Sequence, residues 1–382
     1  MQLLSTQPYK GTRDFYPEDM RLRNWFFGKI REALELSAYE EYNGPMLESL
    51  EMYIAKSGEE IANEQTYNFT DRGGRRLAIR PEMTPSVARI VAAKMGELNY
   101  PLKWFSIPNM YRYERPQRGR LREFWQLNVD IFGCDTFEAD LDVIESAIAV
   151  LRAFGADETM FKVHINNRRF FNDVIAAIAN TDTEGARKVS KIVDKKNKVT
   201  REAYENEMKA LGLSDEQIAK IDSLYTMDIK DATALCPESR GSQELSSLFD
   251  MLEKTGLDKY CVFDFGIIRG LDYYTGTVFE VFDEAPENNR AMFGGGRYDN
   301  LVDMFAKNSK ISGVGYGMGV TASLYLGTKK FGKQIDYAIK GHYSHIIVMG
   351  ASELDAGIVK VKNLATREET EVVADKLGEF FK

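Results

Sequence analysis

Segments with the composition of β-strands lie on both sides of a long block of this chain that has almost no strand character. Residues 166–256 carry long charged helical patterns such as EGARKVSKIVDKK, whereas strand-like sequence precedes and follows the block. A sheet that is interrupted by a helical block favours an α+β fold, built on antiparallel hairpins and carrying a helical insertion.

The elements before the block follow from their periodicity. Apolar residues recur at helical spacing in residues 18–38 and 85–98, which predicts two helices. The predicted strands are residues 66–71, 75–81, 103–114 and 123–133. Arg72, Gly73 and Gly74 separate the first two strands and indicate a hairpin turn.

Composition restricts the chemistry and the compartment. The three cysteines lack CxxC spacing, and the three histidines, His164, His342 and His345, lie apart from the motifs described below. Both facts argue against zinc sites and against histidine-assisted nucleophiles. No window approaches eighteen consecutive apolar residues and the first residues form no signal region, so we predict a cytoplasmic protein without a membrane span. The net charge of −8 means that a nucleic-acid partner would need a local basic patch.

A row of polar side chains is predicted on one face of the strand at residues 123–133. The two-residue period of a strand places four residues on that face: Phe124, Gln126, Asn128 and Asp130. Arg112 and Glu114 likewise share a face on the preceding strand. The row could face water, as half the faces of antiparallel sheets do. Alternatively, it could line a small-molecule site, with an arginine for phosphate, carboxylates for amino groups and a phenylalanine for a flat ring.

Two loops resemble phosphate sites to different degrees. RPQRGRLR holds four arginines in eight residues, Arg115, Arg118, Arg120 and Arg122. It could be a solvated hairpin tip or a clamp for polyphosphate or an RNA backbone. GTKKFGKQ (327–334) has glycine and lysine spacing typical of a P-loop, but Gln334 replaces the magnesium-binding Ser or Thr, so we interpret it as a surface turn.

RGLDYYTG (269–276) interrupts what otherwise reads as one strand. CVFDFGII precedes it and TVFEVF follows it, and both are typical strand sequences. An arginine, an aspartate and two adjacent tyrosines take positions where a buried strand would have apolar residues. These polar groups need a role other than packing.

Five motifs in this order resemble those of the histidyl-tRNA synthetase family, which are class II aminoacyl-tRNA synthetases. They are GTRDFYP, Pro45, YRYERPQRGRLREFWQ, RGLDYYTG and FGGGRYDNLV. The resemblance implies the class II antiparallel sheet with flanking helices. It also implies ATP-dependent attachment of L-histidine to tRNA(His) through a histidyl-adenylate, Mg²⁺ bound with the ATP, and a homodimer in which Pro45 belongs to the interface motif.

The resemblance also implies roles for single residues around histidine. Arg269 would reach between the histidine carboxylate and the α-phosphate of ATP, stabilising the charge that builds there. The residues that match the family's histidine site are Glu82, Thr84 and Gln126 for the α-ammonium group, and Asp130, Tyr273, Tyr274 and Tyr298 for the imidazole. Asp130 stands where relatives often have glutamate, so that contact could be mediated by water.

The ATP site carries over in the same way. Arg112 matches the motif 2 arginine on the α-phosphate, Glu114 the acceptor of the adenine amino group, and Phe124 the ring under adenine. Arg120 or Arg122 should meet the terminal phosphates or the tRNA acceptor end. No residues match a dedicated metal site, because magnesium would arrive with ATP.

Motif 3 is the main departure from the family pattern. In the family, a glycine run leads into a helix whose arginine binds ATP. In this chain, GVGYGMG (313–319) is followed by VTASLYLG, which contains no arginine. Either motif 3 is absent from this protein, or several tens of residues are missing at Gly319/Val320. We therefore predict a catalytic core at 1–319, interrupted by the insertion at 166–256, and an anticodon-binding domain at 320–382 that lacks its front part.

Two non-catalytic functions remain as alternatives to the synthetase. One is a histidine sensor such as the regulatory subunit of ATP phosphoribosyltransferase, and the other is a tRNA-binding sensor. The intact RGLDYYTG argues against the first, and the absent motif 3 arginine is the support for the second.

Overall fold

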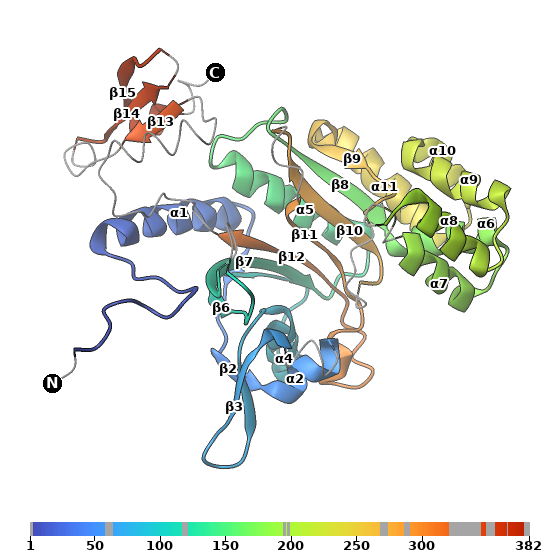
Figure 1. The fold of residues 1–382 in the computed structure, drawn as a ribbon, viewed down its shortest axis with the longest axis horizontal. Coiled ribbons are helices and arrows are strands. Elements are labelled where there is room, and N and C mark those ends of the chain that lie inside the picture. Colours follow the sequence, from blue (N-terminus) through green and yellow to red (C-terminus); the bar gives the residue numbers. More distant parts are fainter. Residues whose placement is uncertain are drawn as a thin grey trace. The chain divides into compact units, whose positions relative to one another are not determined.

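A computed structural model describes most of the chain (Figure 1): residues 3–57, 64–116, 121–193, 196, 199–267, 274–285, 291–320, 345–348, 356–364 and 366–377. The chain forms two compact units, Met1–Thr321 and Ala322–Lys382. Among the described residues, no helix combines the length and the apolar character that crossing a membrane requires.

A nine-stranded sheet forms the centre of the first unit. Its order is β1 (Glu40–Glu41), β5 (Leu102–Ser106), β7 (Glu123–Phe132), β12 (Gly313–Val320), β11 (Ala291–Arg297), β10 (Thr277–Asp283), β8 (Phe161–Asn167) and β9 (Cys261–Phe263), and β6 (Asn109–Tyr111) pairs with β7. The β1–β5 and β8–β9 pairs are parallel, and the other pairs are antiparallel. The α+β prediction with a mainly antiparallel sheet is thus confirmed.

One face of this sheet packs against helices α1 (Pro17–Leu36), α5 (Phe137–Arg152) and α11 (Arg240–Thr255) in a single hydrophobic core. The helix predicted at 18–38 is α1, whose Ile30 and Leu34 are buried four residues apart, as the helical period requires. Leu127 and Val129 of β7 belong to the same core. Figure 1 shows α1 and α5 on this side of the sheet, and α2 and α4 on the other.

The opposite face meets α2 (Leu50–Ser57), α4 (Thr84–Lys94) and a small sheet in the order β2 (Leu47–Ser49), β4 (Arg76–Ile79), β3 (Tyr67–Thr70). The predicted hairpin between β3 and β4 is confirmed. Asp71 accepts hydrogen bonds from the backbone of Gly73 and Gly74, and Gly74 takes a φ of +77°, which glycine adopts without strain. Val87 and Val91 of α4 pack in a second core on this face.

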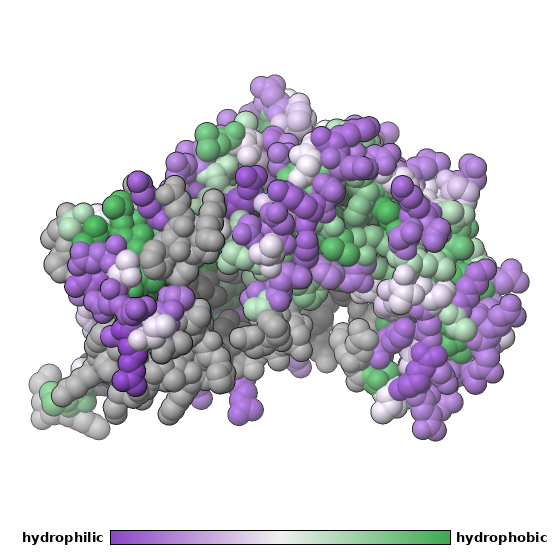
Figure 2. Space-filling model, turned by 90° about the horizontal axis from the view of Figure 1, so that it is seen from above, coloured by the Kyte–Doolittle hydropathy of each residue, from purple (hydrophilic) through white to green (hydrophobic). Residues whose placement is uncertain are grey.

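The helical block follows β8. It contains α6 (Arg168–Ala179), α7 (Thr183–Val193), α8 (Arg201–Ala210), α9 (Asp215–Ser223), α10 (Ile229–Ala234) and α11. A short 3₁₀ turn, η2 (Leu224–Thr226), lies between α9 and α10, and another, η3 (Asp258–Tyr260), follows α11. β8 extends to Asn167, two residues into the block, because Asn166 and Asn167 pair with Val278 and Thr277 of β10. In the view of Figure 2, hydrophilic residues cover much of the described surface, with hydrophobic residues scattered between them.

The prediction of a single strand at residues 103–114 is wrong. β5 and β6 are separate strands that both pair with β7, and the break falls at Ile107 and Pro108. Proline has no N–H to donate to a ladder, so the pairing is interrupted there. Since β6 ends at Tyr111, Arg112 and Glu114 follow the strand and do not share one of its faces.

The expectation that RGLDYYTG lies inside one strand is also wrong. The strand before it is β9 and the strand after it is β10, and β8 lies between them in the sheet. The chain must therefore leave the sheet edge at β9 and return on the other side of β8. Residues 268–273 lie outside the described residues.

The second unit contains an antiparallel sheet in the order β13 (His345–Val348), β14 (Ile358–Asn363), β15 (Glu369–Val373), followed by the turn η5 (Ala374–Lys376). Val359, Val361 and Val372 form its small core. A further 3₁₀ turn, η4 (Val302–Met304), belongs to the first unit. The segment interpreted as a surface turn, 327–334, lies outside the described residues.

Candidate functional site

The polar row of β7 lies opposite a row of glycines on β12. The register pairs Gly315 with Asp130 and Gly317 with Asn128, and directly opposed residues of an antiparallel pair project to the same face. A Cβ atom at Gly315 would lie 2.5 Å from Asp130 Oδ1, and one at Gly317 would lie 2.0 Å from Gln126 Nε2. The glycines therefore allow the polar side chains to lie directly over β12.

Asp130 is the titratable residue of this row, and its environment is unusual for a carboxyl group. Its side chain is buried, and its Oδ1 accepts a hydrogen bond from the Tyr298 hydroxyl. Among the described residues, its Oδ2 has no hydrogen-bond partner. Burial raises the pKa of Asp130 to about 7, while the Tyr298 hydrogen bond and the Lys56 charge act in the opposite direction. Because Asn128 is buried as well, this part of the row does not face water.

Two tyrosines from the histidine-specific motifs border Asp130. The ring of Tyr298 packs edge-on against Phe132 with centroids 6.0 Å apart, and it covers Gly313, where a Cβ would lie 2.4 Å from the ring. The ring of Tyr274 lies against Gly296, where a Cβ would lie 2.8 Å away. Both tyrosines are buried in the core that includes α4. Tyr273 and Arg269 lie outside the described residues.

The residues predicted to hold the α-ammonium group come from two elements. Glu82 and Thr84 lie at the start of α4, whereas Gln126 projects from β7. The Oε1 of Gln126 is buried and has no hydrogen-bond partner in the part of the chain that the structure describes. Oε2 of Glu82 accepts a hydrogen bond from Lys56 Nζ at 2.5 Å. Sequence reasoning missed Lys56, because a lysine in a short amphipathic helix reads as a solvent-facing residue, and only the packing of α2 reveals that it is buried.

The predicted ATP residues divide into two groups. The Arg112 guanidinium lies 5.1 Å from the centre of the Phe124 ring, and its Nε donates to the Pro81 carbonyl at 2.9 Å. Arg122 makes local contacts: Nη1 donates to the Tyr9 hydroxyl at 2.6 Å and Nε to the Glu114 carbonyl at 3.1 Å. Arg120 lies outside the described residues.

Both flanks of residues 268–273 are tied to the end of β8. The buried amide of Asn166 donates to the carbonyls of Phe265 and Ile267, at 3.0 and 3.2 Å. The backbone N–H of Arg168 donates to the Gly276 carbonyl at 2.8 Å. The described residues on either side of this segment are therefore held by the end of β8.

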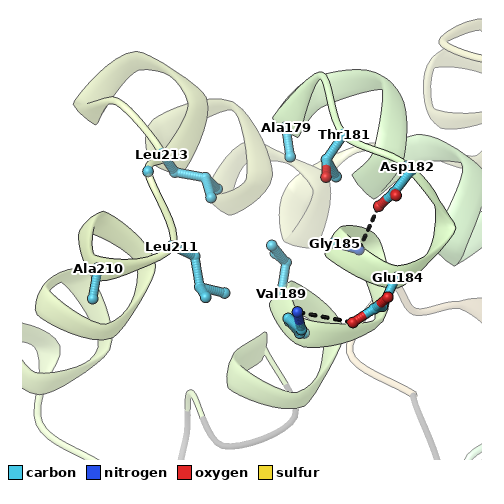
Figure 3. Close-up of a pocket in the computed structure, with 11 residues that line it drawn as sticks. Ala179, Thr181, Asp182, Glu184, Gly185, Val189, Ala210, Leu211 and Leu213 are labelled. Atoms are coloured by element: carbon cyan, nitrogen blue, oxygen red, sulfur yellow. Dashed lines mark hydrogen bonds and ion pairs between the residues drawn. The ribbon is translucent and has the colours of Figure 1, made fainter.

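A separate groove lies in the helical block, where the α6–α7 and α8–α9 connections meet (Figure 3). Its described polar groups bind one another: Asp182 accepts from the Gly185 backbone at 2.8 Å, and Lys188 pairs with Glu184 at 2.9 Å. Because these polar groups already have partners, the groove is a weaker candidate for a ligand site than the polar row of β7. In the described part of the chain, no group of three or more His, Cys, Asp or Glu residues could hold a metal ion.

Comparison with known families covers nearly the whole chain. Residues 11–322 match the family described as Histidyl-tRNA synthetase, and residues 316–382 match the one described as Anticodon binding domain. The chain is 39% identical to the histidine–tRNA ligase of Leptospira biflexa, over 96% of this chain and 95% of that protein. It is 35% identical to the histidine–tRNA ligase of Halobacterium salinarum, over 94% of each chain.

Solved structures show the same fold. A Bacillus halodurans protein titled as an ATP phosphoribosyltransferase regulatory subunit/histidyl-tRNA synthetase superimposes with a TM-score of 0.71 at 27% identity, over 84% of this chain and 82% of that one. The histidyl-tRNA synthetase of Nostoc sp. PCC 7120 superimposes with a TM-score of 0.70 at 22% identity, over 99% of both chains.

The alignments also measure a difference in length. The Leptospira alignment spans 417 positions, whereas 96% of this 382-residue chain is about 367 residues, which leaves about 50 positions without a counterpart here. β12 runs without a break through Gly319 and Val320, which pair with Gln126 and Trp125. The shortfall is similar in size to the several tens of residues expected to be missing, but the alignment length does not locate it, so a gap at Gly319/Val320 stays a prediction.

Proposed function

Since this chain belongs to the histidyl-tRNA synthetase family, which attaches histidine to tRNA, we propose that it activates histidine with ATP on the polar face of β7 and β12. The observation that carries this proposal is the buried Asp130, which binds Tyr298 through one oxygen, while its other oxygen has no partner among the described residues. A buried polar atom without a partner is costly, so it indicates a place that a ligand completes.

The unpaired oxygen suits the imidazole of histidine. A neutral imidazole has one N–H donor and one acceptor nitrogen, and Asp130 with the phenols of Tyr298, Tyr274 and Tyr273 can complement both. An amino acid without these groups would leave Oδ2 of Asp130 unpaired, which favours strong discrimination against amino acids other than histidine.

The α-ammonium group of histidine would be bound by Glu82, Thr84 and Gln126. The buried Oε1 of Gln126 supports this assignment, because it can accept a hydrogen bond that no described group of the protein donates. Glu82 adds the negative charge that a cation requires.

ATP would be bound beside histidine. We propose that Phe124 stacks under adenine, Glu114 accepts from its amino group, and Arg112 and Arg269 act on the α-phosphate as it is attacked. Arg120 and Arg122 would meet the terminal phosphates or the tRNA acceptor end. Mg²⁺, bound to the ATP phosphates, would neutralise part of their charge. Positioning and charge stabilisation carry such a reaction without a general base.

The same proposal extends to domains and assembly. Residues 1–319 would form the catalytic core around the insertion at 166–256, and residues 320–382 would contribute to anticodon binding in the cytoplasm. Pro45 lies in the motif that forms a symmetric dimer interface in the family, so we expect a homodimer. Light scattering that reports a monomer near 43.4 kDa at micromolar concentration would contradict the dimer.

Histidine-dependent exchange of pyrophosphate into ATP tests the activity. The absent motif 3 arginine makes this test informative, because a histidine or tRNA sensor would bind histidine without exchange. The relatives described above are named as ligases, and the regulatory-subunit alternative has no better support. Exchange above background, abolished by omission of histidine, is the expected result.

A further inference from the structure

Lys56, near the end of α2, is a buried ammonium group to which the proposed function assigns no role. Its side chain is 2% exposed, and Nζ lies 2.5 Å from Glu82 Oε2, while the Glu82 side chain remains 24% exposed. Lys56 therefore approaches Glu82 from the interior of the protein and leaves part of Glu82 accessible.

The other charges near Lys56 belong to the candidate site. Burial lowers the pKa of Lys56, the Glu82 carboxylate raises it, and the charges of Arg112 and Asp130 act on it more weakly in opposite directions. Desolvation of an ammonium group is costly, and the neighbouring inward residues of α2, Leu50 and Tyr53, are buried in a small core. Packing alone would favour an apolar residue at position 56.

We propose that Lys56 is a positioning residue for histidine binding: it fixes Oε2 of Glu82, so that Oε1 faces the α-ammonium group of the substrate. This inference rests on the proposed function, in which Glu82 holds that group. A purely structural lysine, which only ties α2 to the start of α4, would have no preference for one group of the substrate.

The test compares the binding of L-histidine with that of imidazolepropionate, which has the ring and the carboxylate but no ammonium group. By calorimetry, Lys56→Met is expected to weaken L-histidine binding about 10- to 100-fold, and imidazolepropionate binding less than about threefold. If Lys56→Met does not fold, Lys56→Gln gives the same comparison, because it removes the charge at similar length.

Lys103→Met is the matched control. It also removes a partly buried lysine from a short ion pair, with Asp142 at 2.6 Å, but on β5 and outside the proposed histidine contacts. We expect it to leave both affinities unchanged within about twofold.

Glu82→Gln supplies the coupling test. If Lys56 acts through Glu82, adding Lys56→Met to Glu82→Gln should weaken L-histidine binding by no more than about a further twofold. Equal losses for both ligands in Lys56→Met, or full additivity with Glu82→Gln, would overturn the role of Lys56 alone. A wild-type protein that binds no L-histidine would overturn the proposed function and this inference with it.

Discussion

Arg297 and Tyr298 are adjacent in the sequence, yet they take part in two opposite kinds of buried polar site. Arg297 is 1% exposed, and its guanidinium donates to Asp140 at 3.0 Å, to the Thr136 carbonyl at 2.8 Å and to the Cys134 carbonyl at 3.0 Å. Tyr298, on the other face of the sheet, donates to Asp130, whose second oxygen has no partner within the described ranges.

The difference separates a structural site from the proposed binding site. A buried ion pair whose hydrogen bonds are all made fixes the geometry of the fold, here between β11 and α5. A buried carboxylate that is half satisfied costs stability and is retained where a ligand supplies the missing partner. Both sites are buried, so the completeness of their hydrogen bonds, and not burial, is the reason why we propose the Asp130 site as the one that binds a substrate.

The largest expected effect is on stability, when the buried ion pair of Arg297 and Asp140 is broken. Arg297→Met leaves Asp140 buried without its cation, so we expect a loss of about 3–5 kcal/mol of unfolding free energy. Urea denaturation followed by tryptophan fluorescence measures it, because Trp25, Trp104 and Trp125 all lie in the first unit. Adding Asp140→Asn should recover part of the loss; a loss below about 1 kcal/mol would show that the pair is dispensable.

The next largest effect concerns the rate of the proposed reaction at the Asp130 site. Arg269→His should slow histidine-dependent pyrophosphate exchange by a factor of about 100 or more, about 2.7 kcal/mol, because a cation beside the reacting atoms is lost. Histidine affinity, measured by calorimetry, should change less. Near-normal exchange in this variant would remove Arg269 from the reaction.

A third change fills the space over β12. Gly315→Ala would place a Cβ 2.3 Å from the Val129 carbonyl and 2.5 Å from Asp130, so we expect a loss of about 1–3 kcal/mol in urea denaturation together with weaker histidine binding. Gly319→Ala is the matched control for stability, since a Cβ there meets nothing within 4 Å. Equal stabilities of the two variants would mean that β12 can shift to accommodate a side chain.

The last prediction concerns the pH dependence of stability that Asp130 causes. Burial raises its pKa from 3.8 to about 7, so the folded state holds a proton that the unfolded state releases above about pH 4. This contribution to stability is complete below pH 4 and is lost as the pH rises to about 7. Asp130→Asn cannot titrate, so its stability relative to the wild type should increase between pH 5 and 7 and then level off. A difference that stays constant from pH 5 to 8 would contradict the raised pKa.

Much of the fold could be predicted from local patterns. The helix α1, the β3–β4 hairpin and the strand β7 each follow from a spacing within a few residues, because side-chain direction repeats with the period of the element. The same rule placed Gln126 and Asp130 on one face of β7 before any pairing was known. Motif order then indicated the family.

Only the tertiary structure decided which elements become neighbours. β8 separates β9 from β10, the glycines of β12 lie over the polar row of β7, and Lys56 of α2 meets Glu82 beside α4. Each of these contacts joins residues far apart in the chain, and no local period encodes such a pairing. The physical basis of these pairings is the burial of the whole sheet. Burial brings polar groups from distant parts of the chain together and decides which of them find hydrogen-bond partners.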